Sequence, residues 1–208
     1  MSESQFRRYT TLPYLLDVLY EKRLTLLDPV RWEDKNDSRF LRIYKTKKNL
    51  KSVLALCFAE APETYQHWKI YSGNTSGVCI EFNKDRLINR LKHEEGFISS
   101  LVTYKTLGVL RNETPTVGDL PFVKRYAYRG EQEFRIIYTS SDKNINVKHI
   151  AISPDDINII TFNPWIDVIS LNSIKSIIKI IEGCEKIKVR RSTITENDEW
   201  KMIGENSI

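Results

Sequence analysis

The stretch Val53-Leu-Ala-Leu-Cys-Phe58 indicates the fold class of this chain. A continuous apolar run of this length is typical of a buried central strand, rather than of a strand with one solvated face. Further along, Val78, Ile80 and Phe82 alternate with Cys79 and Glu81, which predicts another strand. We therefore expect a sheet at the centre of the fold.

Helical and strand patterns are interspersed along the rest of the chain. Leu12, Leu15, Leu16 and Leu19 share one helical face after an N-cap at Thr11. Helices are also expected at 62–71, 84–94 and 173–181, and strands at 6–10, 24–27, 97–104, 134–138, 147–152, 157–162 and 187–193. Because strands and helices do not alternate as regular βαβ units, the predicted class is α+β.

The prediction is of a single domain over residues 1–208, with a core at about 6–194. We expect a central mixed or antiparallel split sheet flanked by helices. Asn36-Asp37-Ser38 is predicted to form a turn or cap, and 106–118 is the most loop-like segment. The helix near 173–181 is expected to bury Ile174, Ile177 and Ile178. The tail at 195–208 is polar apart from Trp200 and Ile203 and is predicted to be partly ordered at best.

Composition and charge are those of an ordinary globular protein. The chain has 208 residues, of which 41% are apolar and 28% charged, so a collagen-like, low-complexity or disordered chain is excluded. Lysine and arginine exceed aspartate and glutamate by 32 − 27 = 5. This modest excess is compatible with nucleic acid or nucleotide partners without requiring them.

The cysteines and the chain start predict a cytoplasmic protein. Cys57, Cys79 and Cys184 are odd in number and widely spaced, which fits neither a disulfide framework nor a zinc site. The polar start, Met1-Ser-Glu-Ser-Gln5, has no signal-peptide pattern, and no segment has the roughly 20 apolar residues of a membrane span. No membrane partner is therefore expected.

The most informative polar motif is Gly130-Glu-Gln-Glu-Phe-Arg135. On a strand, Glu131, Glu133 and Arg135 would share one face, with Phe134 on the other. Such a face can be an exposed sheet surface with a Glu–Arg pair. The functional alternative is that it presents a carboxylate to a cationic or hydroxyl-bearing ligand, with the arginine keeping it ionised.

Two segments nearer the N-terminus could bind phosphate or ribose. Arg8 and Thr10 would share a strand face opposite Tyr9, where Arg8 is either a surface arginine or a bidentate phosphate ligand. The loop at 72–77 supplies the hydroxyl and amide groups of Ser72, Asn74, Thr75 and Ser76, but it has no phosphate-loop signature.

Two other chemistries are weakly indicated. Lys186, Lys188 and Arg190 alternate along one predicted strand, and can protect a sheet edge or follow the phosphates of a nucleic acid. His67, His93 and His149 are isolated from further metal ligands in the sequence, so no metal site is predicted.

A series of these segments resembles the bacterial domain-of-unknown-function family 2971. The most specific part is Cys57-Phe58, then Trp68-x-x-Tyr71, then Gly77-Val-Cys-Ile-Glu-Phe82. Tyr9–Leu12, the 24–29 strand, Trp32 with Asn36-Asp37, and Glu131-x-Glu-Phe-Arg135 extend the resemblance over about 6–140. Ser38 replaces the proline that many members carry after Asn-Asp. The family name implies no activity.

The order of Arg8, the 72–76 serines and Glu131-x-Glu133 also resembles the ADP-ribosyltransferase fold. That resemblance implies NAD as substrate: Arg8 and Thr10 at its pyrophosphate, Ser72 or Ser76 at its nicotinamide ribose, and Tyr71 stacked on nicotinamide. It further implies that Glu133 stabilises the oxocarbenium-like transition state, Glu131 selects or activates the acceptor, and Arg135 lies beside the cofactor. The serines precede the strand that would usually carry them.

The resulting expectation is an effector that transfers ADP-ribose from NAD to a nucleic acid or protein. Such families often act in toxin or antiphage systems, and a regulatory partner protein is conceivable. Two other classes remain open: a nuclease that uses the basic strand and the Glu131/Glu133/Arg135 face, and a non-enzymatic module that senses a nucleotide or a partner. Whether the chain is an enzyme is therefore left open.

Overall fold

The computed structural model describes residues 5–72, 75–92 and 94–207 and divides the chain into two compact units. Unit 1 contains Met1–Phe6, Arg23–Ala61 and Asn83–Ile152, and unit 2 contains Arg7–Lys22, Pro62–Phe82 and Ser153–Ile208. The single domain expected from the sequence stays a prediction.

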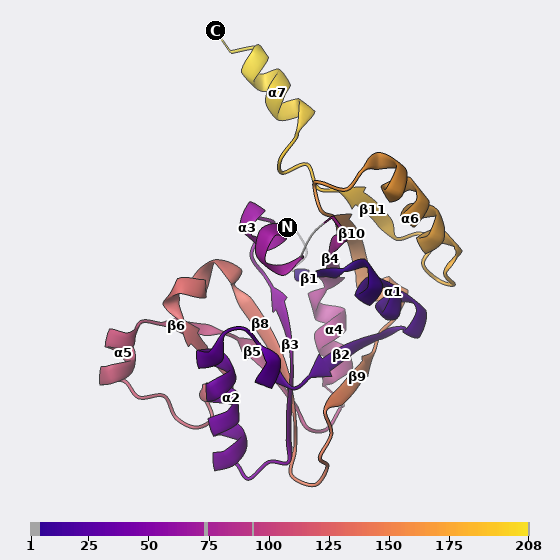
Figure 1. The fold of residues 1–208 in the computed structure, drawn as a ribbon. Helices are drawn as coiled ribbons and strands as arrows, with labels where there is room; N and C mark the ends of the chain where they lie inside the picture. Colours follow the sequence, from indigo (N-terminus) through magenta and orange to yellow (C-terminus); the bar gives the residue numbers. More distant parts are fainter. Residues whose placement is uncertain (1–4, 73–74, 93, 208) are drawn as a thin grey trace. The chain divides into compact units, whose positions relative to one another are not determined.

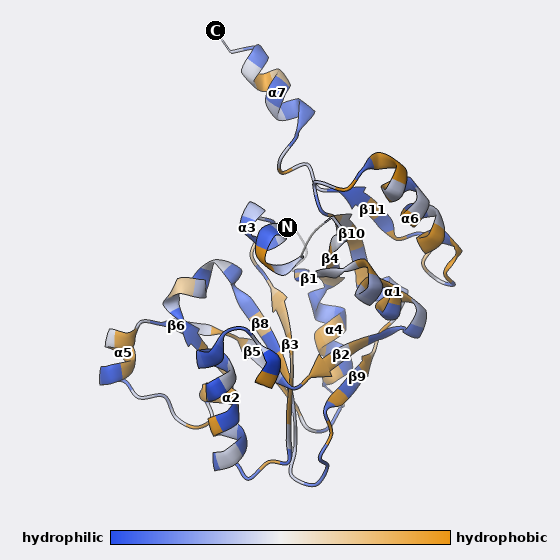
Figure 2. Cartoon of the chain, viewed as in Figure 1, coloured by the Kyte–Doolittle hydropathy of each residue, from blue (hydrophilic) through white to orange (hydrophobic). Residues whose placement is uncertain are grey.

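Unit 1 is built on an antiparallel sheet in the order β5-β8-β3-β2-β9 (Figure 1). Its strands are β2 (Arg23–Leu27), β3 (Ser52–Ala59), β5 (Phe97–Leu101), β8 (Glu133–Ser140) and β9 (Val147–Ala151). Strand β3 pairs with β8 over its whole length, and Figure 2 draws much of β3 in orange because most of its residues are apolar. The burial of β3 confirms that its apolar run forms a central strand.

The other elements of unit 1 surround this sheet. They are η1 (Pro29–Arg31), α2 (Lys35–Lys47), α4 (Lys84–Leu91), α5 (Leu107–Asn112) and η2 (Leu120–Phe122), together with η3 (Tyr126–Glu131) and the parallel pair β6 (Thr103–Lys105) and β7 (Val123–Arg125). Helix α2 packs on the sheet through Leu41 and Tyr44, which join a buried cluster with Val53 and Ile137.

Two expectations for unit 1 are wrong. Asn36-Asp37-Ser38 is not a turn but lies in the first turn of α2, because the Asp34 carboxylate caps the helix by accepting from the N–H groups of Asn36 and Asp37. The segment at 106–118 is not loop throughout, since Thr106 caps the short helix α5.

Unit 2 has a mixed sheet in the order β11-β10-β4-β1. Strand β10 pairs antiparallel with β4 and parallel with β11. The strands are β1 (Gln5–Thr11, of which Gln5 and Phe6 belong to unit 1), β4 (Gly77–Asn83, of which Asn83 belongs to unit 1), β10 (Ile157–Phe162) and β11 (Lys188–Arg191). The helices are α1 (Leu12–Glu21), α3 (Tyr65–Tyr71), η4 (Pro154–Asp156), α6 (Val168–Ile180) and α7 (Asp198–Glu205).

These elements confirm the α+β class, with a mixed sheet and flanking helices. The C-terminal part differs from expectation: α6 begins at Val168, and the tail contains helix α7. Helix α6 buries Leu171 and Ile178, while Ile177 is exposed instead of belonging to the core. Among the described residues, no helix has the length and apolar character needed to cross a membrane.

Candidate functional site

The motif around Glu133 forms a buried group of charges in unit 1. We call Asp37, Lys124, Glu131, Glu133 and Arg135 the charge cluster. Four elements supply it: the first turn of α2, strand β7, the end of η3 and the start of β8. The β3–β8 register places Arg135 opposite Cys57 and Glu133 opposite Ala59, at the end of the central strand pair. The cluster therefore lies where the most buried part of the sheet ends.

Arg135 is the centre of the charge cluster. Its side chain is 0% exposed, and its two terminal nitrogens donate to the two Asp37 oxygens at 2.9 and 2.7 Å. Nε donates to Glu133 Oε1 at 2.7 Å, and Nη1 also donates to the carbonyl of Pro121 at 2.7 Å. The guanidinium lies over the ring of Trp32, with Cζ 4.9 Å from the ring centre. The Arg135 side chain is thus fully buried and donates to other protein groups, which contradicts the expectation that it touches a cofactor.

Lys124 joins the two glutamates of the motif. Its Nζ donates to Glu131 Oε2 at 2.7 Å and to Glu133 Oε2 at 2.9 Å. Glu131 does not share a strand face with Glu133, as the alternation predicted, because η3 ends at Glu131 and Gln132 has a left-handed φ of 45°. The lysine nevertheless brings both carboxylates to one point. The side chains of Lys124 and Glu131 are 11% and 14% exposed and form the most accessible part of the charge cluster.

Electrostatics keep Glu133 ionised despite its burial. Burial alone would raise the pKa of Glu133, but the positive charges of Arg135 and Lys124 outweigh it and lower that pKa to about 2. The same carboxylates raise the pKa of Lys124 against the effect of its burial. For Asp37, burial outweighs Arg135, so the pKa is raised. With three carboxylates and two cations, the charge cluster has a formal charge of −1.

Aromatic side chains border the accessible part of the cluster. The hydroxyl oxygen of Tyr104 accepts from the backbone N–H of Glu133 at 2.8 Å. Burial raises the pKa of Tyr104 to about 12, so its hydroxyl keeps its proton at neutral pH. The ring of Tyr128 lies 4.7 Å from Lys124 Nζ. The arrangement combines an anionic centre with aromatic faces and a neutral hydroxyl.

Arg8 and Thr10, the predicted phosphate ligands, lie on β1 in unit 2. The N–H of Leu12, just after β1, donates to the carbonyl of Ser76 at 2.9 Å. The structure therefore brings the end of the serine-bearing loop to the end of the strand that carries Arg8 and Thr10. Asn74 of the same loop lies outside the described residues.

The other two loop candidates differ in accessibility. Ser72 is buried, and its hydroxyl donates to the Trp68 carbonyl at 2.5 Å, so it closes helix α3 rather than facing a ribose. Tyr71, at the end of α3, is exposed, and its ring centre lies 6.2 Å from that of His67. Of these residues, Tyr71 and Ser76 are the ones that remain candidates for ligand contact.

Sequence reasoning missed Asp37, Lys124 and Tyr104. Asp37 is 98 residues from Arg135 along the chain, so no local pattern connects them. Lys124 lies in a segment without clear periodicity. The one signal available was the cost of a buried guanidinium, which requires a carboxylate from another element.

The basic strand and possible metal ligands can also be located. Arg190 on β11 donates from Nε to Thr161 Oγ1 at 3.1 Å, and its Nη2 lies 3.4 Å from Glu81 Oε1. One of the three basic residues predicted to alternate along this strand therefore pairs with a buried carboxylate. Lys186 precedes β11 rather than lying in it. Within the described ranges, no group of three or more His, Cys, Asp or Glu side chains is arranged to hold a metal ion. His93 lies outside these ranges.

The comparison with protein families confirms the first resemblance. The model of the family described as "protein of unknown function (DUF2971)" matches residues 67–157. This region includes Trp68-x-x-Tyr71, the 77–82 strand and Glu131-x-Glu-Phe-Arg135. The motifs before residue 67 lie outside the match. No curated protein matches the sequence.

Solved structures of DarT from Thermus sp. 2.9 are similar to this chain. The complex with NAD+ has 10% sequence identity and a TM-score of 0.46, covering 92% of this chain and 96% of that chain. The complex with ADP-ribosylated ssDNA has 8% identity and a TM-score of 0.47, with 92% and 95% covered. The complex with carba-NAD+ has 10% identity and a TM-score of 0.45, with 92% and 97% covered.

Proposed function

We propose that this protein transfers ADP-ribose from NAD, bound as a substrate, to a macromolecular acceptor. The observation that supports this most is the position of Glu133: a buried carboxylate held ionised, with Glu131 on the same lysine amine. Breaking the bond between nicotinamide and ribose creates positive charge on the ribose ring. A preorganised anionic group stabilises such charge most effectively where water is excluded.

The proposed reaction assigns different roles to the two glutamates. As the C1′–N bond breaks, nicotinamide leaves with the electron pair, and the charge cluster stabilises the cationic ribose through Glu133. A nucleophilic oxygen or nitrogen of the acceptor then bonds to C1′. Glu131, the more accessible carboxylate, takes the proton that the nucleophile loses. Lys124 and Arg135 hold the two carboxylates in position, and neither contacts the substrate.

The remaining candidates from the sequence are proposed for the other parts of NAD. Arg8 on β1 is assigned to the pyrophosphate, which an arginine can bind bidentately, and Thr10 lies two residues further along the same strand. Ser76 is assigned to the nicotinamide ribose and Tyr71 to stacking on the nicotinamide. Ser72 is no longer assigned to the ribose, because its hydroxyl is buried and bonded to Trp68.

The acceptor is proposed to be a nucleic acid or a protein. The setting proposed from the sequence is the cytoplasm, in a toxin or antiphage system, with a partner protein that regulates the activity. These proposals follow from the resemblance of Arg8, the 72–76 serines and Glu131-x-Glu133 to the ADP-ribosyltransferase fold.

The test is to incubate the purified protein with NAD labelled in its adenylate part, with single-stranded and double-stranded nucleic acid and with cell lysate. The expected result is labelled acceptor together with released nicotinamide in equal amounts. Glu133→Gln is expected to lower the rate by roughly 10²–10³-fold, as does the loss of one preorganised group in other enzymes. Arg8→Lys keeps the charge but loses the bidentate geometry, and is expected to raise the KM for NAD.

Glu113→Gln is the matched control. Glu113 is an exposed glutamate of unit 1 that pairs with Lys105 at 3.0 Å, and its loss is expected to leave the rate unchanged. Because Glu133→Gln can also affect folding, each variant is compared by circular dichroism, and Glu131→Gln provides a less buried second test. Full transfer activity in both glutamine variants would contradict the proposal. Metal-dependent cleavage of nucleic acid without NAD, or NAD binding without turnover, would instead identify a nuclease or a sensor.

A further inference from the structure

The solvent face of helix α6 carries an unexpected row of apolar side chains. Ile169 is 81% exposed and Ile180 is 79% exposed, and Ile177 lies beside them with 43% exposed. The opposite face, with Leu171 and Ile178, packs into unit 2, so α6 is apolar on two sides. Figure 2 shows orange recurring along α6. Helices that are apolar all round are normally buried, which indicates that something covers the outer face.

The middle of this face permits close approach by another helix. Ser173 and Ser176 lie between Ile169 and Ile180 at helical spacing. Their hydroxyls donate to the carbonyls of Ile169 and Asn172, each at 3.1 Å. Because both hydroxyls are already satisfied within the helix, covering them leaves no unpaired donor. We call Ile169, Ser173, Ser176, Ile177 and Ile180 the α6 outer face.

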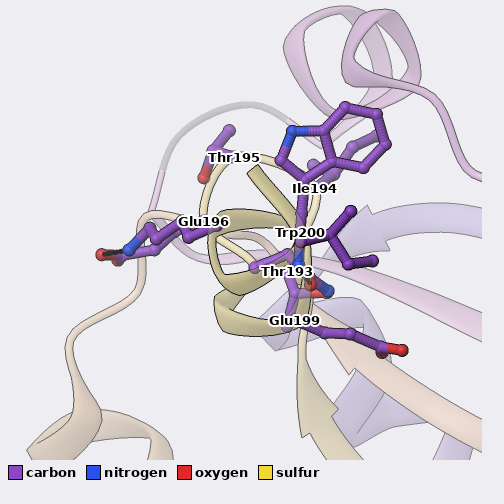
Figure 3. A pocket seen from close by; sticks show the side chains of 9 residues that line it. Thr193, Ile194, Thr195, Glu196, Glu199 and Trp200 are labelled. Atoms are coloured by element: carbon purple, nitrogen blue, oxygen red, sulfur yellow. Dashed lines mark hydrogen bonds and ion pairs between the residues drawn. The ribbon is translucent and has the colours of Figure 1, made fainter. Parts of the chain in front are cut away.

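Helix α7 is a second apolar element that its own unit does not bury. Trp200 is 80% exposed and Ile203, one turn further along, is 61% exposed. Together with Ile194 in the preceding segment, they line an open hollow of about 640 Å³ (Figure 3). Figure 3 draws the side chains that line this hollow, with Trp200 and Ile194 among those labelled. It is large enough to receive a branched apolar side chain.

Local hydrogen bonds order the segment that leads from β11 into α7. Ser192, at the end of β11, is buried and bonded to the Glu63 carboxylate. A turn follows in which the Glu196 N–H donates to the Thr193 carbonyl, and Asn197 then caps α7 by accepting from the Trp200 N–H. These bonds define the turn that precedes α7 and the first turn of the helix, and Trp200 and Ile203 are exposed in this arrangement. Its exposed side chains are therefore available to another molecule.

The two apolar surfaces have opposite charge. Within Val168–Ile180, α6 contains Lys175 and Lys179 and no acidic residue. Within Asp198–Glu205, α7 contains three carboxylates and one lysine, a formal charge of 1 − 3 = −2. Lys201, that one lysine, is already paired with Glu196 at 2.9 Å. Apolar area and charge thus make α7 complementary to α6.

We propose that the protein forms a symmetric dimer in which α7 of each copy docks on the α6 outer face of the other. A two-fold arrangement uses this contact twice and so doubles the area that one helix contact buries, and a stable interface buries roughly 1,200–2,000 Å² in total. Ile180 or Ile169 of one copy fills the hollow beside Trp200 of the other. This inference does not depend on the proposed enzymatic function.

The test is the solution mass of the full chain, measured by light scattering across a dilution series, for wild type and for two single variants. Ile180→Glu damages the α6 outer face and Trp200→Glu damages α7. Wild type is expected to have twice the mass of one chain and to dissociate on dilution. Each variant is expected to weaken the dimer at least 100-fold. Leu107→Glu, a similarly exposed apolar position on α5 of unit 1, is the control and is expected to behave as wild type.

Mixing the two variants separates this model from other dimers. In a mixed dimer, the intact α7 of the Ile180→Glu chain meets the intact α6 of the Trp200→Glu chain, so one of the two contacts is restored. The mixture is therefore expected to contain more dimer than either variant alone. A wild-type monomer at all concentrations, or a dimer that either variant leaves unchanged, would overturn the proposal. So would a mixture that shows no gain, because this would indicate contact between like surfaces.

Discussion

Replacing Arg135 by leucine tests whether the charge cluster is the principal polar support of unit 1. The substitution leaves the Asp37 carboxylate without its two donors, and Glu133 without the donor to Oε1. Lys124 remains 2.9 Å from Glu133 but lies 4.0 Å from Asp37, so it compensates Glu133 better than Asp37. Removing one partner of a buried ion pair costs about 3–5 kcal/mol. We expect Arg135→Leu to lower the free energy of unfolding by that amount.

Arg190→Leu is the matched control for this change. Arg190 also pairs with a buried glutamate, but its side chain is 56% exposed, and Glu81 keeps Arg7 at 3.5 Å. Exposed pairs of this kind contribute about 0–1 kcal/mol. The two arginines therefore differ in burial and in the number of carboxylate bonds, while the substitution is the same.

Urea unfolding followed by circular dichroism measures the free energy of unfolding of both variants, and a thermal scan with the same signal measures their Tm. For a chain of this size, a loss of 3–5 kcal/mol corresponds to a decrease of roughly 6–20 °C in Tm. Adding Asp37→Leu to Arg135→Leu is expected to recover part of the stability, because a buried carboxylate without a partner is then absent. Two results would contradict this role of the charge cluster. One is that Arg135→Leu lowers the free energy of unfolding no more than Arg190→Leu does. The other is that the double variant loses the sum of what Asp37→Leu and Arg135→Leu lose singly.

Three further predictions concern single positions. Gly77→Ala is expected to destabilise the protein by about 1–3 kcal/mol in the urea assay, because the added Cβ would lie 2.6 Å from the Ser72 carbonyl oxygen. As a control, the Cβ added by Gly130→Ala meets no atom within 4 Å, so this variant is expected to be close to neutral. Because the pKa of Glu133 is lower in the folded chain, wild type is expected to be more stable than Glu133→Gln by about 3 kcal/mol above pH 4.5. This difference in the free energy of unfolding is expected to fall as the pH approaches 2. A constant difference from pH 6 to pH 3 would refute this. Burial lowers the pKa of His67, so its contribution should be complete above pH 6.5 and lost as the pH falls, which a comparison of wild type with His67→Gln at pH 7.5 and 5.5 would detect.

Elements with a strong local pattern were predictable from the sequence. The apolar run at 53–58 and the alternation at 78–82 correspond to β3 and β4, and Thr11 with Pro13 correctly marked the start of α1. Helices α2 and α5 were missed because polar residues dominate them and their caps, Asp34 and Thr106, were not read as helix starts. Helix α7 was missed for a similar reason, since its apolar residues are few.

The sequence by itself determined the α+β class and the positions of the main strands along the chain, and it identified Glu131-x-Glu133 as a charged motif. It could do so because side-chain periodicity and the cost of burying charge act locally. Only the tertiary structure decided which groups surround Glu133. Asp37 reaches it from a helix 98 residues away from Arg135 in the chain, and Lys124 reaches it from a short strand of another sheet. These contacts form because a buried charge must find its counter-charge in space, and the chain's local pattern carries no record of which distant segment provides it.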